Sequence, residues 1–408
     1  MRRKIVILLT TGTLLYFFLN FQRTAVPGSI FDELQLGLGS PDAKFITAIG
    51  AAFMYIYAAG QLLSGLMVDR YGGLRCILWG GLLFAVGSVL TPFTGNVWVM
   101  YLLRGVTGLG ASCIYLSLIQ ALSETCPGNF TVVFGLVICI GYAGSIAAGS
   151  PFVAAVHTVG WKESLIGVGA VILLAWAVFA VVFRTLPPRP VAAVPLRLRP
   201  ILDVFRRTQN SRFALLFCIN WGLYYTFLTV IGKKFLEDHC RMSPMGASAV
   251  ITAMAFLAAG NNFASGIVSR LAGNRRRPFL VGASVLALSC NAVIMGALLL
   301  GVRHWWLAVP LLLMTLTANV SPIQVAWTKE INPPDQGGIS LATLNAASYF
   351  SVAVVSCIAG VLLEVFPPNV LDGVKIYGLN SYRLYFAFAT AALVPGTIAI
   401  FGIRETAP

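Results

Sequence analysis

Charged residues are scarce in this chain of 408 residues, since 10% are Asp, Glu, Lys or Arg and 58% are hydrophobic. A water-soluble domain carries roughly 25% charged residues, because its surface must face water. The mean hydropathy of +0.84 points the same way. These values exclude an ordinary soluble domain and indicate an integral membrane protein surrounded by lipid.

Residues that bind metals or perform catalysis are also lacking. The eight cysteines form no CxxC pair, and His157, His239 and His304 all fall in predicted outer loops. This spacing does not support a zinc site, and we expect no cofactor. No paired Asp set, Ser–His pair or ligand set falls near the middle of a hydrophobic run, so we expect no enzymatic activity.

Long hydrophobic runs recur from one end of the chain to the other. A helix needs about 20 apolar residues to cross a hydrocarbon core of about 30 Å. The runs predict an all-α polytopic membrane protein with twelve transmembrane helices, the first too long for a cleaved signal peptide. They are 5–34, 45–68, 74–91, 97–122, 130–156, 164–183, 213–235, 247–271, 278–302, 305–327, 339–365 and 382–403.

A segment rich in Pro and Arg interrupts the runs at the middle of the chain. It has no apolar span, and its composition is typical of a linker. The sequence therefore predicts an N-terminal six-helix bundle at 1–185, a cytoplasmic linker at 186–210 and a C-terminal six-helix bundle at 211–408.

The net charge of +14 follows from basic loops that all fall on one side of a twelve-helix topology. By the positive-inside rule this side and both termini are cytoplasmic, and we expect the bacterial inner membrane. Attraction to anionic lipid explains the charge, so we expect no nucleic-acid partner. The bases on this side include Arg2, Arg3, Lys4, Arg70, Arg75, Arg184, Arg189, Arg197, Arg199, Arg206, Arg207, Arg212, Arg270, Arg275, Arg276 and Arg277. The opposite loops hold Asp32, Glu33, Asp42, Glu163, Glu237 and Asp238.

The loop between the second and third runs contains a specific motif, Gly65-Leu-Met-Val-Asp69-Arg70-Tyr-Gly72-Gly-Leu-Arg75. Gly65 would permit close helix contact, and Gly72 a tight turn. Asp69 can face a helix N-terminus or an arginine, while the two arginines would anchor the turn at the lipid headgroups. The motif resembles the signature loop of the major facilitator superfamily, in which this loop latches the two halves on the cytoplasmic side.

Two other segments share this resemblance. The fourth run contains Arg104-Gly-Val-Thr-Gly-Leu-Gly-Ala, similar to a family segment, and we expect Arg104 to brace this helix from the bundle interior. The second half carries a degraded copy of the loop, in which Ser269 replaces the acid. The resemblance implies two pseudo-symmetric six-helix bundles, the major facilitator fold, and a secondary transporter that works by alternating access. It implies a small-molecule substrate, contact with membrane lipids and a monomeric protein.

Arg23 is the strongest candidate for contact with a substrate. It lies deep in the first run, and its segment FQRTAVPGSIFDELQLG resembles the first helix of organic-anion carriers of the superfamily, related to anion:cation symporters. A guanidinium matches a carboxylate or phosphate with two parallel hydrogen bonds. Two alternatives remain: Arg23 extends to the outer interface, or it pairs with a backbone carbonyl.

Other polar residues fall near the middle of the runs, where such transporters bind their substrates. Any one of them could instead hydrogen-bond between helices. Together, aromatic and amide groups suit a medium-sized polar solute with apolar parts. With Arg23, the candidate substrate-binding residues are Tyr55, Tyr142, Tyr224, Tyr225, Asn261, Asn319, Asn345 and Tyr349.

Acidic residues are missing from the middle of every run. A coupling ion, proton or sodium, would therefore act through a substrate carboxylate, through Asp32 or Glu33 near the outer mouth, or not at all. The sequence predicts symport of a small organic anion, a carboxylate or a phosphorylated metabolite. The alternatives are an efflux transporter of drug-like or metabolite molecules, with Arg23 structural, and a non-transporting sensor on the same fold.

Overall fold

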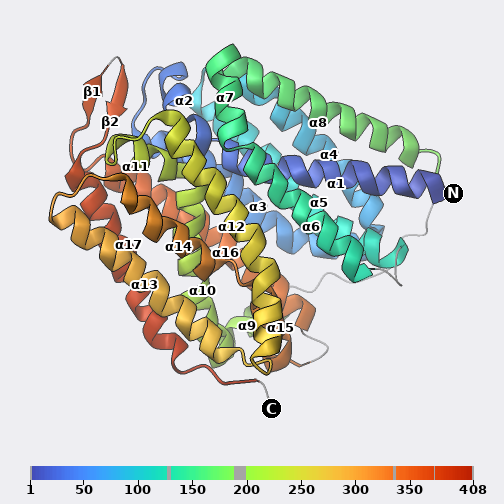
Figure 1. Cartoon of the computed structure of the whole chain (residues 1–408). Coiled ribbons are helices and arrows are strands. Elements are labelled where there is room, and N and C mark those ends of the chain that lie inside the picture. Colours follow the sequence, from blue (N-terminus) through green and yellow to red (C-terminus); the bar gives the residue numbers. More distant parts are fainter. Residues whose placement is uncertain (1, 126–129, 188–198, 334–336, 372, 407–408) are drawn as a thin grey trace.

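The protein is described from a computed structural model that covers residues 2–125, 130–187, 199–333, 337–371 and 373–406. Long helices dominate these residues (Figure 1). The α-helices are α1 (Arg2–Ala25), α2 (Phe31–Gly37), α3 (Ala43–Tyr71), α4 (Gly73–Leu90), α5 (Val97–Thr125), α6 (Phe130–Ala147), α7 (Ser150–Val159), α8 (Trp161–Phe183), α9 (Arg199–Arg206), α10 (Thr208–Thr226), α11 (Gly232–Asp238), α12 (Pro244–Leu271), α13 (Arg277–Leu299), α14 (Ala308–Ala318), α15 (Ser321–Ile331), α16 (Gly337–Leu363) and α17 (Leu379–Ile400).

Several shorter elements join the helices. The 3₁₀ turns are η1 (Gly28–Ile30), η2 (Thr91–Phe93) and η5 (Trp305–Leu307), and η4 (Phe227–Ile231) is a π-helix. Strands β1 (Asn369–Leu371) and β2 (Val374–Ile376) pair antiparallel. The sequence analysis did not predict this hairpin.

Eleven helices of the described residues are long and apolar enough to cross a membrane, and the bent pair α6–α7 makes twelve if it is one span. This agrees with the twelve predicted crossings. The chain is thus a polytopic helical membrane protein. Of the predicted linker at 186–210, residues 188–198 lie outside the described residues, while α9 and the start of α10 occupy most of the remaining part.

Four spans that the sequence analysis treats as continuous are broken. The first helix ends at Ala25 before Pro27, whose ring removes a backbone donor and disfavours helix in the residue before it. The pair α6–α7 bends by 41° at Gly149, just before Pro151. The π-helix η4 divides the seventh span, and Asn319 ends α14 in the tenth.

The helices form two groups that converge at one end. Helix α1 packs against α5, α6 and α8, and α10 packs against α16 and α17. Contact between the groups runs along α3 with α16 and along α6 with α12. We call the end with α2, α11 and the β-hairpin the hairpin side. From there the groups spread apart toward the two chain termini (Figure 1).

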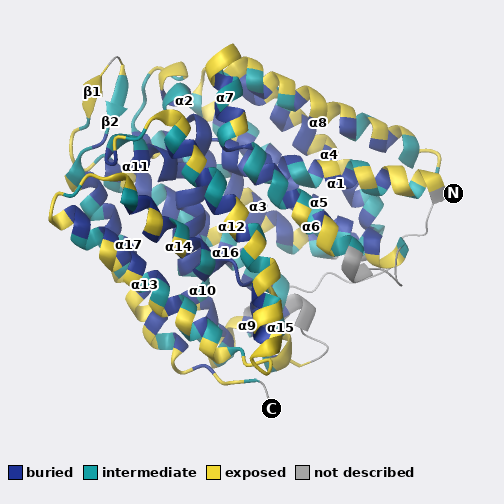
Figure 2. Cartoon of the chain, viewed as in Figure 1, coloured by how far each residue is buried: buried dark blue, intermediate teal, exposed yellow. Residues whose placement is uncertain are grey.

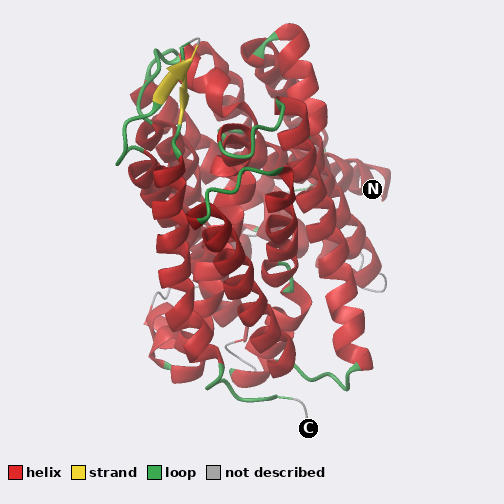
Figure 3. Ribbon diagram, turned by 60° about the vertical axis from the view of Figure 1, so that its left-hand side comes forward, coloured by secondary structure: helices red, strands yellow, loops and turns green. Residues whose placement is uncertain are grey.

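The pattern of buried and exposed residues fits a protein surrounded by lipid and not by water. Buried residues fill the space between helices, and many exposed residues on the outside are large and apolar (Figure 2). Examples are Leu102, Val181 and Phe263, which are 67%, 65% and 74% exposed. Such residues would be costly in water but match a lipid solvent. Figure 3 shows that helices make up most of the structure and that the β-hairpin lies near one end of it.

Close packing within the first group depends on small residues of α5. A Cβ added to Gly110 would lie 2.3 Å from the backbone nitrogen of Phe84 in α4. Only glycine permits this approach of two helix backbones, as is common between transmembrane helices. The Gly-x-Gly-Ala segment noted in the sequence therefore serves helix contact.

Candidate substrate site

A cavity lies between the two groups of helices, and half of its lining residues are aromatic. The space between these atoms is about 450 Å³, with the open solvent at its mouth included. Both groups contribute to the wall, α1 and α6 from the first and α10, η4, α12 and α16 from the second. All of the lining side chains are uncharged. They are Tyr16, Asn20, Tyr142, Ser145, Trp221, Tyr224, Tyr225, Leu228, Ala255, Ala258, Asn319 and Tyr349.

Irregular helix geometry occurs at this wall. Leu228 belongs to the π-helix, and Asn319 stands where α14 ends. Backbone groups freed by such breaks must find partners inside the protein, because lipid offers none. The Asn261 side-chain amide donates to the carbonyls of Leu316 and Asn319, at 2.8 Å each. The Asn261 side chain therefore satisfies backbone carbonyls at the break in the tenth span, and it does not line the cavity.

Arg23 lies beside the cavity, directly behind Tyr349. Its side chain is 3% exposed, and its Nη1 donates to the Tyr349 hydroxyl at 3.2 Å. The guanidinium carbon lies 3.9 Å from the centre of the Tyr57 ring and 4.7 Å from that of Tyr349, within cation–π range. Tyr225 also interacts with Arg23 electrostatically. Aromatic faces, not carboxylates, thus surround this cation.

Two nitrogen atoms of Arg23 have no hydrogen-bond partner among the described residues. Both atoms, Nε and Nη2, are buried. No salt bridge of the described residues includes Arg23. The side chain therefore neither extends to the outer interface nor pairs with a backbone carbonyl, the two alternatives that the sequence left open. A buried charge without a counter-ion is costly and calls for a partner.

Arg104 is held differently, although it is buried nearby. Its guanidinium donates to the Gln22 side chain at 3.3 Å and to the backbone carbonyls of Gln22 and Val26 at 3.3 and 2.9 Å. These carbonyls belong to the last turn of α1 and the residue after it, before Pro27. Arg104 thus joins α5 to the end of α1, which is the bracing role expected of it.

A chain of hydrogen bonds connects Asn345, in the second group, to a residue that contacts Arg23. Asn345 in α16 donates to the Gln61 side-chain oxygen at 2.7 Å, and Gln61 in turn donates to the Tyr57 hydroxyl at 2.6 Å. Tyr57 supplies the ring that covers Arg23. Asn345 therefore reaches Arg23 through two intermediates.

The structure brings together some of the predicted substrate-binding residues but not all. Tyr142, Tyr224, Tyr225, Asn319 and Tyr349 line the cavity, with Arg23 behind them. Tyr55, Asn261 and Asn345 do not line it.

Tyr55 lies between α3 and α16. Its ring contacts Phe350, and its hydroxyl lies 4.0 Å from the sulfur of Cys357. Tyr55 therefore belongs to the interface of these two helices and not to the cavity wall.

Sequence reasoning left several wall residues out of the candidate set. Tyr16 and Asn20 precede Arg23 by seven and three positions, a spacing that places them on one helix face. Trp221 precedes Tyr225 by four. Helical spacing from Arg23 would have found Tyr16 and Asn20, and helical spacing from Tyr225 would have found Trp221.

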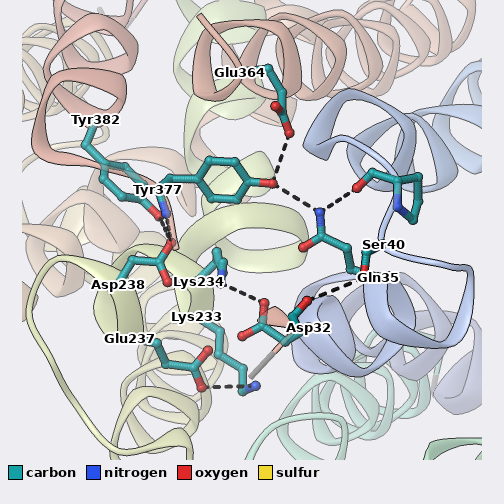
Figure 4. Close-up of polar contacts among 12 residues, drawn as sticks. Asp32, Gln35, Ser40, Lys233, Lys234, Glu237, Asp238, Glu364, Tyr377 and Tyr382 are labelled. Atoms are coloured by element: carbon teal, nitrogen blue, oxygen red, sulfur yellow. Dashed lines mark hydrogen bonds and ion pairs between the residues drawn. The ribbon is translucent and has the colours of Figure 1, made fainter. Parts of the chain in front are cut away.

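A buried charge cluster links the two groups at the hairpin side (Figure 4). The Lys234 ammonium lies 2.7 Å from Asp32 of α2 and 2.9 Å from Asp238 of its own helix α11. Lys233 pairs with Glu237 at 3.1 Å. Both lysines are at most 3% exposed. The sequence analysis placed these acids in loops and overlooked the lysines, whose i,i+4 spacing to the acids is the signal.

Further polar contacts extend the same interface (Figure 4). The Gln35 amide of α2 donates to the Tyr377 hydroxyl at 3.1 Å, and this hydroxyl donates to Glu364 at 3.1 Å. Lys375 in β2 lies 3.0 Å from Asp42, and hydrogen bonds from Lys375 and Lys44 lower the pKa of Asp42. The hairpin side is therefore closed by contacts between the groups.

The predicted signature loop forms the turn between α3 and α4. Gly72 has φ of +82°, which favours glycine, so the expected tight turn is present. Arg70 lies over the Tyr71 ring, and Arg75 is in the first turn of α4. The Asp69 side chain lies outside the described residues. The close contact expected at Gly65 is absent here, because no described atom lies within 4 Å of an added Cβ.

Metal ligands do not gather anywhere in the described part of the chain, where no group of three His, Cys, Asp or Glu could hold an ion. The histidines differ from expectation in detail. His157 lies in the last turn of α7, not in a loop, and His239 is buried just after α11.

Known transporters resemble this chain in sequence. A probable sulfoacetate transporter, SauU, from Cupriavidus necator is 26% identical over 237 residues, 53% of this chain and 54% of that protein. A chloramphenicol resistance protein from Pseudomonas aeruginosa is 23% identical over 85% of this chain and 81% of that protein. Monocarboxylate transporter 11 from Mus musculus is 26% identical over 59% and 56%. The chain spans about half the length of the first and third.

Solved structures resemble it in fold. The nucleoside transporter NupG aligns with a TM-score of 0.73 at 15% identity, over 96% of this chain and 100% of that one. A peptide transporter POT in complex with sulfate aligns with a TM-score of 0.77 at 13% identity, over 98% and 94%. The sequence model of the Major Facilitator Superfamily matches residues 8–354. This chain belongs to the Major Facilitator Superfamily.

Proposed function

We propose that this protein is a secondary active transporter of a small organic anion, a carboxylate or a phosphorylated metabolite. The observation that carries the proposal is the buried guanidinium of Arg23, which has two nitrogen atoms without a hydrogen-bond partner and no acidic partner among the described residues. Burial of an unpaired arginine charge costs free energy unless an anion binds to it and neutralises it. The substrate is that anion.

The remaining contacts come from the cavity wall. Tyr224, Tyr225 and Tyr349 supply aromatic faces for the apolar parts of the substrate, and Tyr142 and Asn319 supply polar groups. Tyr349 already bonds Arg23, so the substrate reaches the guanidinium beside this hydroxyl. The relatives named as sulfoacetate and monocarboxylate transporters agree with an anionic substrate.

Alternating access follows from the division into two groups. We propose that residues 1–185 rock against 211–408 around the cavity, with 186–210 as the linker. In the present conformation the hairpin side is closed by the Lys234 cluster, and the groups spread toward the termini (Figure 1). For the cavity to open to the hairpin side, the contacts of Lys234 with Asp32 and of Gln35 with Tyr377 must break.

The basic loops orient the molecule. We propose a monomer in the bacterial cytoplasmic membrane, with both termini in the cytoplasm and the hairpin side outside. No described acid lines the cavity. A coupling proton or sodium ion would therefore act at the hairpin-side cluster or on the substrate carboxyl.

The test is uptake by purified protein in proteoliposomes. A thermal-shift screen of carboxylates, phosphorylated metabolites, amino acids and amphipathic cations first finds a ligand, because a bound ligand stabilises the folded state. The ligand is then assayed with Arg23→Lys, which keeps the charge but loses the planar fork. The control is Arg212→Lys, at a residue that bonds the Gly402 carbonyl far from the cavity. Normal uptake by Arg23→Lys would refute anion recognition by this residue.

A second candidate is efflux of drug-like or metabolite molecules. Two observations favour it: the aromatic wall, and the match to a chloramphenicol resistance protein over 85% of this chain. In that case Arg23 only links α1 to Tyr349 of α16. The screen above separates the two, because stabilisation by uncharged or cationic compounds alone would support efflux.

A further inference from the structure

We infer that the cavity takes a monocarboxylate that also carries a hydroxyl or carbonyl oxygen, and that it discriminates against dianions. This inference rests on the proposed function and narrows its substrate class. It depends on three features: the number of available charges, the free edge of Arg23, and an unpaired donor in the wall.

Only one cation is available to a ligand in this part of the described structure. None of the residues that line the cavity is charged, and Arg23 lies directly behind Tyr349. Arg104 is engaged by three hydrogen bonds to α1 and the residue after it, and retains only its Nε. Lys233 and Lys234 are paired with carboxylates at the hairpin side. A second negative charge on the ligand would therefore be buried without a partner.

The free edge of Arg23 fits one planar group. Nε and Nη2 lie along the same edge of a guanidinium, and a carboxylate accepts from both through two parallel hydrogen bonds. The Tyr57 and Tyr349 rings approach this guanidinium, and Nη1 is used by the Tyr349 hydroxyl. A phosphate dianion carries more charge than this single edge can neutralise.

The wall offers one conspicuous donor for the rest of the ligand. The indole Nε1 of Trp221 is buried and has no hydrogen-bond partner among the described residues, although Trp221 lines the cavity. An indole N–H only donates, so it requires an acceptor oxygen on the ligand. A hydroxyl or carbonyl on the carbon chain supplies it. Leaving this donor unpaired would cost binding free energy.

The test uses two sets of anions with matched carbon chains: lactate, malonate and propionate, and gluconate, glucarate and hexanoate. Binding to the purified full-length protein is measured calorimetrically at about pH 7.5, where all carboxyl groups are ionised. In at least one set we expect the hydroxylated monoanion to bind tighter than the dianion by about tenfold or more. We also expect the hydroxylated monoanion to bind more tightly than the unsubstituted monoanion.

Trp221→Phe keeps the aromatic ring and removes the donor. It should abolish most of the preference for the hydroxylated over the unsubstituted monoanion. The matched control is Trp176→Phe, because the Trp176 indole donates to the Leu78 carbonyl at 2.8 Å and does not line the cavity. This control should leave the preference unchanged.

The outcomes test the substrate preference and the proposed function separately. Dianion binding equal to or tighter than monoanion binding in both sets overturns the inference while anion transport stands. A preference that survives Trp221→Phe overturns the role of the indole. No binding by any of the anions, together with Arg23→Lys uptake like that of the parent protein, overturns the proposed function itself.

Discussion

Lys234 should decide how readily the cavity opens to the hairpin side. It is 1% exposed and lies between Asp32, at 2.7 Å, and Asp238, at 2.9 Å. Asp32 belongs to the first group of helices, whereas Lys234 and Asp238 share α11. Opening therefore breaks the contact with Asp32 and keeps the other. Asp32→Asn removes the attraction between the groups and leaves Lys234 neutralised by Asp238.

The size of this effect follows from the distance. Two unit charges 2.7 Å apart attract by about 6 kcal/mol at an effective dielectric constant of about 20. Desolvation of both groups offsets most of this attraction. Asp32 is 20% exposed and regains water when the side opens. A net loss of about 2 kcal/mol remains, which corresponds to roughly a 30-fold shift toward the open state.

Labelling of a cysteine in the cavity measures this shift. Ala255 lines the cavity and is 1% exposed, so Ala255→Cys in a cysteine-free background reacts with a membrane-impermeant maleimide only when the hairpin side opens. We expect Asp32→Asn to raise the labelling rate by about 30-fold. The control is Lys233→Met, which loses a buried ion pair with Glu237 inside α11 alone. An unchanged rate in Asp32→Asn, or an equal rise in Lys233→Met, would refute the reasoning.

Three further outcomes are expected. Gly110→Ala overpacks α5 against α4, so it should lower the unfolding temperature in detergent by an amount equivalent to about 1–3 kcal/mol, whereas Gly65→Ala, beside open space, should not. Gly360→Val forces α16 away from α3 and should raise the cavity labelling rate. Because hydrogen bonds from Lys375 lower the pKa of Asp42, this link is complete above about pH 4 and is lost as the pH falls through the lowered pKa. A spin label on the β-hairpin should therefore become more mobile only in acid, and Asp42→Asn should make it mobile at every pH.

The transmembrane spans could be predicted because lipid imposes a length and a polarity on each of them. Breaks at Pro27 and Pro151 were readable in principle, since a proline inside a hydrophobic run often interrupts the helix. It does not always do so, because α17 continues through Pro395. The π-helix at 227–231 could not be predicted in this way. Its sequence, FLTVI, is apolar and carries no helix-breaking residue. Its position depends on tertiary contact, where Gly28 approaches the Thr229 carbonyl so closely that a Cβ would lie 2.4 Å from it.

Depth in the membrane was easier to predict than the direction in which a side chain points. Tyr55 and Asn345 lie on the helices α3 and α16 but point into the contact between them, not into the cavity. In water the apolar face of a helix marks the interior. In lipid both faces are apolar, so periodicity does not separate the cavity wall from the helix interface.

Two of the buried cations in the described residues, Lys234 and Arg23, show where a substrate should be sought. Lys234 lies at the closed interface, and two carboxylates of the protein neutralise it. Arg23 lies beside the central cavity, where tyrosine rings and hydroxyls surround it and no described carboxylate pairs with it. A buried charge that the protein neutralises stabilises one conformation. A buried charge that the protein leaves without a counter-ion requires a ligand that binds and dissociates. By this argument the lack of a counter-ion for Arg23 among the described residues, more than the shape of the cavity, supports the proposal that the substrate is an anion.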